Sequence, residues 1–238
     1  KWLVMVLVLI ACGSKPQEDG KPQTGSSAGS GTPAAPLRVG VTLHPYFSWT
    51  ASAAAGTDIE VVAVLPGEVD AGNYQPSPDD IAKLAKLDAI VGNGIGHDDF
   101  IRDMIKASGN TRIVVIEANA DTPLLPSAHG DGKNSHTFIS FTNAIQQTRL
   151  IAAKLGTLRP AHAAKLKANA SAYADKLRAI QAGAAKSLAG AKIKRVVTVH
   201  DGYGYLLQEF GIDIAAVVEP AHGLVPSAAE LRDVVDLL

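Results

Sequence analysis

Two short histidine-containing segments carry the clearest chemical signal in the sequence. Asn134-Ser135-His136 precedes a long helical stretch, and His200-Asp201 ends an apolar run beyond it. Neutral imidazole is the commonest protein ligand for zinc and related metals. If the helical stretch joins two lobes, the two imidazoles can face one cleft. The pattern therefore predicts capture of a metal ion.

The elements that must position these histidines alternate in type along the chain. Strands separated by helices predict a parallel sheet that is covered on both faces. Ligands of such sheets bind beyond the carboxyl ends of the strands. His44 and the segments 70–74 and 93–97 each follow an expected strand end. The expected strands are 37–43, 59–65, 89–93 and 112–116, and the expected helices are 47–55, 79–86 and 98–107.

The second half of the chain continues the same alternation around a longer helical region. Helical periodicity covers 141–155 and 161–188, and apolar strands are expected at 195–200 and 214–218. A helix over 231–238 reaches the last residue without a stop signal, which predicts a truncated lobe. The expected fold class is α/β, with two lobes of helix-flanked parallel sheet, a long rigid connecting helix and a metal cleft between the lobes. The predicted boundaries are 1–12 for a signal peptide, 13–36 for a tether, 37–140 for an N-terminal α/β lobe, 141–190 for the helical region and 191–238 for an incomplete C-terminal α/β lobe.

The start of the chain predicts export and anchoring. Lys1 is followed by an apolar run of about ten residues, whereas a membrane-spanning helix needs roughly 20. Residues 9–12 read Leu-Ile-Ala-Cys and resemble the lipobox of bacterial lipoproteins, in which the cysteine is lipidated. Residues 13–36 are polar and rich in Gly, Ser and Pro, as flexible tethers are. We therefore expect Cys12 to anchor an extracytoplasmic protein to a membrane, on the periplasmic side or at the cell surface.

Composition and missing motifs exclude several classes of protein. The formal net charge of −1 argues against a nucleic-acid-binding protein. The single cysteine offers no intrachain disulfide framework. The expected α/β part, 37–238, contains no H-E-x-x-H zinc motif, no serine nucleophile elbow and no phosphate-binding Gly-Lys-Ser/Thr loop. We therefore do not expect an enzyme.

Five segments, in order along the chain, resemble the periplasmic metal-binding proteins of zinc and manganese ABC importers. The similarity extends from Leu37 to Leu238. Residues 66–76 are similar to a G-x-D-P-H-x-Y-x-P loop of that family, 93–96 to an N-G-L-G turn, 134–138 to a D-P-H-x-W segment, 197–205 to an H-D-A-F-x-Y segment and 219–227 to a stretch that ends in P-S.

The resemblance implies a monomeric binding protein that delivers Zn(II), or Mn(II), to an ABC permease and its ATPase. His136 and His200 match metal ligands of the family. Gly72 stands where the first loop of the family has a histidine. The fourth ligand of the family, a carboxylate, would lie beyond Leu238. Two of the four expected metal ligands therefore have no residue assigned to them by the resemblance.

A substituted ligand is our own hypothesis for the missing loop histidine. His97 follows Gly96 at the turn after the third expected strand, and His44 follows the first. Three imidazoles and one carboxylate suit a tetrahedral zinc site. We predict His97 as the third ligand, with His44 as a ligand or a supporting residue. Each histidine also has a plainer interpretation, as a helix-start, strand-end, turn or solvated residue.

Three further residues are expected near the site. Asp201 could accept the second N–H of a metal-bound histidine, as carboxylates commonly do, or lie on the surface. His222 follows the last expected strand, and Tyr74 belongs to the loop that contains Gly72. His129 is expected to be solvent-exposed, and His162 is expected to have no role.

Two other functions compete with metal uptake. A surface adhesin on the same scaffold would show the same tether and fold. A zinc-dependent hydrolase would use three histidines and an open water position, but the sequence offers no obvious general base. A histidine-rich ligand set favours zinc, because manganese prefers more oxygen ligands.

Overall fold

The structure, a computed structural model, describes residues 35–67, 69, 74–127, 132–219 and 224–237. The predicted signal peptide with Cys12 lies outside the described residues, as do almost the whole predicted tether and Asp70, Gly72, His129 and His222. Among the described residues, no helix combines the length and the apolar character needed to cross a membrane.

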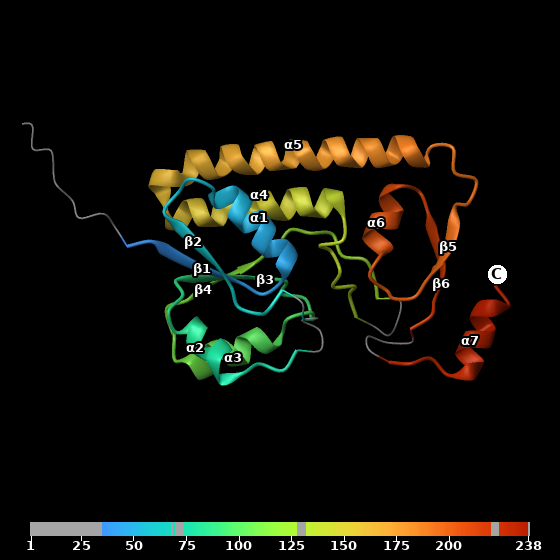
Figure 1. The fold of residues 1–238 in the computed structure, drawn as a ribbon, viewed down its shortest axis with the longest axis horizontal. Helices are drawn as coiled ribbons and strands as arrows, with labels where there is room; N and C mark the ends of the chain where they lie inside the picture. Colours follow the sequence, from blue (N-terminus) through green and yellow to red (C-terminus); the bar gives the residue numbers. More distant parts are fainter. Residues whose placement is uncertain (1–34, 68, 70–73, 128–131, 220–223, 238) are drawn as a thin grey trace, which may run out of the picture. The chain divides into compact units, whose positions relative to one another are not determined.

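A four-stranded parallel sheet forms the centre of the first part of the molecule (Figure 1). Its strand order is β2-β1-β3-β4, and the central strands β1 and β3 are almost completely buried. Because all the strands are parallel, their carboxyl ends meet at one edge of the sheet. The strands are β1 (Leu37–Val41), β2 (Ile59–Ala63), β3 (Ala89–Gly92) and β4 (Val114–Glu117).

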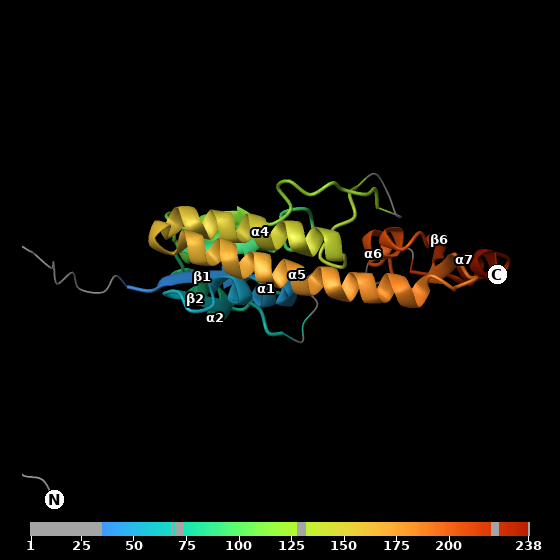
Figure 2. The same cartoon turned by 90° about the horizontal axis from the view of Figure 1, so that it is seen from above.

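Helices cover both faces of this sheet, with α1, α4 and α5 on one face and α2 and α3 on the other (Figure 1). Figure 2 shows α4 and α5 lying side by side along one surface. Ser140 caps the start of α4 by accepting from the Asn143 N–H, and Ser77 and Asp80 form a capping box at α2. The helices are α1 (His44–Ala54), α2 (Pro78–Leu84), α3 (Phe100–Ser108), α4 (Phe141–Leu158) and α5 (Ala163–Leu188), with a 3₁₀ turn η2 (Pro160–His162) before α5.

A second, two-stranded parallel sheet follows α5 (Figure 1). It pairs β5 (Arg195–Thr198) with β6 (Asp213–Val217), and α6 (Gly204–Glu209) connects them. The side chains of β5 and β6 are half-buried or exposed, in contrast to those of the central strands β1 and β3 of the first sheet. The last helix is α7 (Ala228–Val235), which Ser227 caps.

The predicted α/β class, with helix-flanked parallel sheets and one long helix, is confirmed. The observed ends of several helices differ from the expected ends, because the sequence signals for a helix start or stop were missed. The helix expected from Phe47 begins at His44, because Pro45 suits a first turn. The helix expected over 231–238 ends at Val235. The short helix α6 was not predicted. The domain boundaries stay predictions.

Candidate metal centre

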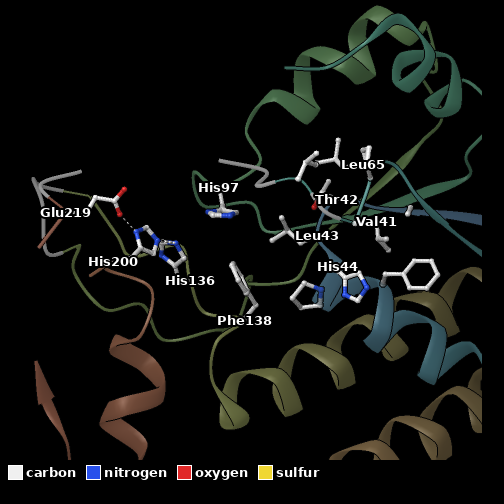
Figure 3. Close-up of a pocket in the computed structure, with 16 residues that line it drawn as sticks. Val41, Thr42, Leu43, His44, Leu65, His97, His136, Phe138, His200 and Glu219 are labelled. Atoms are coloured by element: carbon white, nitrogen blue, oxygen red, sulfur yellow. Dashed lines mark hydrogen bonds and ion pairs between the residues drawn. The ribbon is translucent and has the colours of Figure 1, made fainter. Parts of the chain in front are cut away.

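A cavity of about 710 Å³ opens at the carboxyl ends of β1 and β2 (Figure 3). Much of its wall is apolar and comes from these strand ends and the start of α1. One end of the cavity contains His97, His136, His200 and Glu219, whereas Thr42 and His44 line it farther away, as Figure 3 shows. This end of the cavity is the candidate site.

His136 is fixed by the residue two positions before it. The Oδ1 atom of Asn134 accepts the His136 backbone N–H at 2.9 Å and lies 3.0 Å from its Nδ1. Because an amide oxygen only accepts, Nδ1 must carry the proton, and Nε2 must carry the lone pair. His136 therefore presents a metal-binding nitrogen to the cavity.

His200 is held in a similar way by a carboxylate. Its Nδ1 atom bonds to Glu219, which follows β6 just as His200 follows β5. The Glu219 N–H also donates to the Val199 carbonyl, which continues the pairing of the two strands to the site. The carboxylate stabilises the Nδ1–H form, so His200 also presents Nε2.

The two Nε2 atoms face each other at a separation of 2.9 Å. The ring centroids of His136 and His200 lie 4.6 Å apart, with the rings nearly perpendicular. Two nitrogens about 2.0–2.1 Å from one tetrahedral zinc ion would be about 3.3 Å apart, so a shift of less than about 0.5 Å would admit the metal. Gly202 makes this approach possible, since a Cβ there would lie 3.0 Å from His200 Cδ2 and 3.5 Å from His136 Cδ2.

A buried polar network lies beneath His136. The Asn93 side chain is fully buried and donates to the Ser135 carbonyl at 2.9 Å and to the Tyr46 hydroxyl at 3.1 Å. Asn119 donates to the Asn93 carbonyl, and Gln147 donates to Asn119 and to Thr137. Buried networks of hydrogen bonds help to hold a segment in one conformation. The Asn93 turn thus supports the segment that contains His136.

The two candidates for a third ligand lie in different places. The His97 ring centroid is 5.1 Å from that of His136, and Ser135 Oγ is 3.3 Å from His97 Nδ1. His44 is exposed at the start of α1, and its nearest described ring partner is Phe47, at 6.5 Å. In Figure 3, Phe138 stands between His44 and the other three histidines. The geometry favours His97.

The other expected site residues lie apart from the metal-facing nitrogens. Tyr74 donates to Asp80 of α2 at 2.5 Å and packs near Phe100 at the start of α3. The Asp201 carboxylate accepts from Ser127 at 3.4 Å, and Glu219 rather than Asp201 supplies the carboxylate at His200 Nδ1.

Among the residues that the structure describes, no group of three or more His, Cys, Asp or Glu side chains is arranged to hold a metal ion. The pair His136 and His200 is the part of the site whose nitrogens converge. Sequence reasoning assigned no role to Glu219, although its position after β6 is the signal that was used for His44 after β1. It also assigned none to Asn134, which was quoted only as part of a motif.

Comparisons with known proteins show the family to which the chain belongs. A family model described as "Zinc-uptake complex component A periplasmic" matches residues 39–238. The zinc-binding lipoprotein AdcA of Streptococcus pneumoniae is 26% identical over 97% of this chain and 45% of its own length. The chain thus spans about half the length of the curated relatives it matches.

Two solved structures are similar at higher identity. The SBP FpvC of Pseudomonas aeruginosa in complex with Ni²⁺ is 43% identical, with a TM-score of 0.78 over 85% of this chain and 74% of that one. The same protein with Mn²⁺ is 44% identical, with a TM-score of 0.76 over 84% and 75%. The chain therefore belongs to the family of periplasmic zinc-uptake complex components.

Proposed function

We propose that this chain binds Zn(II), or alternatively Mn(II), outside the cytoplasm and delivers it to the permease and ATPase of an ABC importer. A monomer that is anchored through Cys12 and its tether would carry the ion to the membrane. Family membership supports transport rather than catalysis. The lipoprotein name of its relative AdcA supports the extracytoplasmic location.

The facing Nε2 atoms of His136 and His200 carry the proposal. Each Nδ1 faces an oxygen atom, so each Nε2 presents its lone pair. At 2.9 Å the two Nε2 atoms are within hydrogen-bond distance, so a proton shared between them or a bound cation must offset the repulsion of their lone pairs. A divalent metal ion with imidazole ligands meets this requirement, and the relative FpvC is described with Ni²⁺ and with Mn²⁺.

We infer that His97 supplies the third nitrogen. Its ring lies beside His136 and at the same end of the cavity, whereas His44 lies beyond Phe138. A rotation of the His97 side chain and a small closure of the site would bring its ring to the metal. Three nitrogens and one oxygen ligand favour zinc over manganese.

A zinc competition titration of the metal-free full chain tests capture. We expect one zinc ion per chain, with tight binding that is lost in the double variant His136→Ala/His200→Ala. His97→Ala should weaken binding more than His44→Ala. Tight binding that survives in the double variant would overturn the site. A stronger effect of His44→Ala would exchange the two candidates.

Delivery needs a separate experiment in cells. Cells that lack the gene should lose high-affinity zinc uptake and recover it with the wild-type chain, but not with the double variant. Normal uptake without the gene would contradict delivery while leaving metal binding intact.

A further inference from the structure

The Asn134 side chain contacts both segments that contain the metal-facing histidines. Its Oδ1 atom accepts from His136, as described above, and its Nδ2 atom donates to the Asp201 carbonyl at 2.6 Å. Asp201 directly follows His200 in the sequence. One amide group thus joins two chain segments that are 67 positions apart.

The orientation of this amide group is fixed by its partners. A backbone N–H can only donate and a carbonyl oxygen can only accept, so Oδ1 must face His136 and Nδ2 must face Asp201. Asn134 is 4% exposed, and water therefore cannot readily replace either partner.

Tyr205 reinforces the same contact from α6. Its hydroxyl donates to the Asn134 carbonyl at 2.7 Å and accepts from the Leu125 N–H at 3.0 Å. Tyr205 is 6% exposed. The link between the two segments is therefore a small buried hydrogen-bonded cluster.

We propose that Asn134 is a positioning residue that fastens the His200 segment onto the His136 segment and so holds the two imidazoles at metal-binding separation. The proposal rests on the proposed function, because it concerns the affinity of that same site. The similar family segment, D-P-H-x-W, has aspartate at this position. A carboxylate could accept from His136 but could not donate to the Asp201 carbonyl.

The substitution Asn134→Asp separates the two roles of this side chain. A carboxylate is a stronger acceptor for His136 Nδ1, and it would make that imidazole a better metal ligand. The same carboxylate would repel the Asp201 carbonyl at 2.6 Å. If Asn134 acts only through His136, zinc affinity should hold or rise. If it fastens the two segments together, affinity should fall.

The experiment measures zinc affinity and the dissociation rate for the full chain and its variants. We expect Asn134→Asp to weaken zinc binding about tenfold, the low end of the range for residues that support metal ligands, mainly through faster dissociation. Asn169→Asp is the matched control. Its Nδ2 atom also donates to backbone carbonyls, those of Ala53 and Ala55, but it does so away from the site.

A spectroscopic readout separates positioning from general stability. In the metal-free proteins, ¹⁵N NMR of the histidine rings should show a changed His200 signal in Asn134→Asp and the wild-type signal in Asn169→Asp. Thermal unfolding shows whether each variant is folded at the temperature of the titration.

The outcomes distinguish this proposal from the proposed function. No zinc binding by the wild type would refute the function itself. Tight wild-type binding with unchanged or tighter binding by Asn134→Asp would overturn only the positioning role. If Asn134→Asp does not fold, Tyr205→Phe tests the positioning role instead. Zinc binding that is about threefold weaker supports this role, and unchanged zinc binding overturns it.

Discussion

The segments that present His136 and His200 are supported in different ways. The first lies on a buried polar network, in which the Asn93 amide and the Thr137 hydroxyl are fully buried and hydrogen-bonded. The second follows a strand of half-buried residues, and the neighbouring Val199 is 72% exposed. Both histidines are half-buried, but His136 lies on a buried polar network, whereas His200 extends from a lightly packed strand pair.

This difference suggests how the site can adjust to a metal ion. Densely packed interiors have few alternative arrangements, so His136 should keep its place. The strand pair that contains His200 has fewer buried contacts, and regions of this kind open locally at lower cost. The His200 side should therefore make the small movement that admits an ion.

The largest predicted effect tests whether both histidines are ligands despite their different supports. His136→Ala and His200→Ala should each weaken zinc binding by more than about 100-fold, beyond the usual cost of losing a supporting residue. Competition titration measures both. His162→Ala is the control, because that histidine pairs with Asp58 at the 3₁₀ turn. If either variant kept the affinity of the wild type, the substituted histidine would not be a ligand. The idea of a fixed ligand and a moving ligand would then be wrong.

The next effect concerns the support of the moving side. Glu219→Gln keeps an oxygen acceptor for His200 Nδ1 but removes the charge, and zinc affinity should fall about tenfold. The exposed Glu60→Gln, which alters only a surface pair with Arg38, should leave affinity unchanged. Equal affinities in the two variants would mean that the Glu219 charge does not support His200.

Much of the fold could be predicted because local and global signals agree. Buried apolar strands between capped helices specify a parallel sheet, and Ser77 with Asp80 marks the start of α2 in the sequence itself. The short helix α6 was missed because six residues are too few to show a period.

The site was less predictable because its contacts join distant segments. The sequence locates His97, His136 and His200 at element ends, but the Asn134 link to Asp201 depends on the packing of two segments. Glu219 could have been found, since parallel neighbours end at the same edge. The segments around Gly72 and His222 lie outside the described residues, and expectations for them stay predictions.

A smaller effect tests how closely the two segments must approach. A Cβ at Gly202 would lie 3.0 Å from the His200 ring, so Gly202→Ala should displace it by a few tenths of an ångström. A cost of about 1 kcal/mol corresponds to about fivefold weaker zinc binding. Gly204→Ala is the matched control, because a Cβ there meets its nearest neighbour, a Leu125 methyl group, at 3.6 Å. Equal zinc affinities of the Gly202→Ala and Gly204→Ala variants would show that the His200 ring can move away from the added methyl group without weakening zinc binding.

The smallest effect on binding should come from Asp80, which stabilises the packed region away from the site. Burial opposes its charge, but hydrogen bonds from Lys83, Ser77 and Tyr74 outweigh burial and hold the pKa of Asp80 far below its ordinary value. Asp80→Asn should lower the free energy of unfolding by about 1–3 kcal/mol at pH 7 and leave zinc affinity unchanged.

The pH dependence of this loss follows from the direction of the pKa shift. A depressed carboxyl pKa contributes stability above about pH 4, and that contribution is lost as the pH falls toward the folded-state value. Urea unfolding of wild type and Asp80→Asn should therefore differ most near neutral pH and converge in acid. Asp79→Asn, at the exposed neighbouring position in the same first turn, is the matched control and should cost less stability at pH 7 than Asp80→Asn. If Asp80→Asn also lost zinc affinity, the packed region and the site would not be independent. The position of His136 would then depend on the stability of the region around α2.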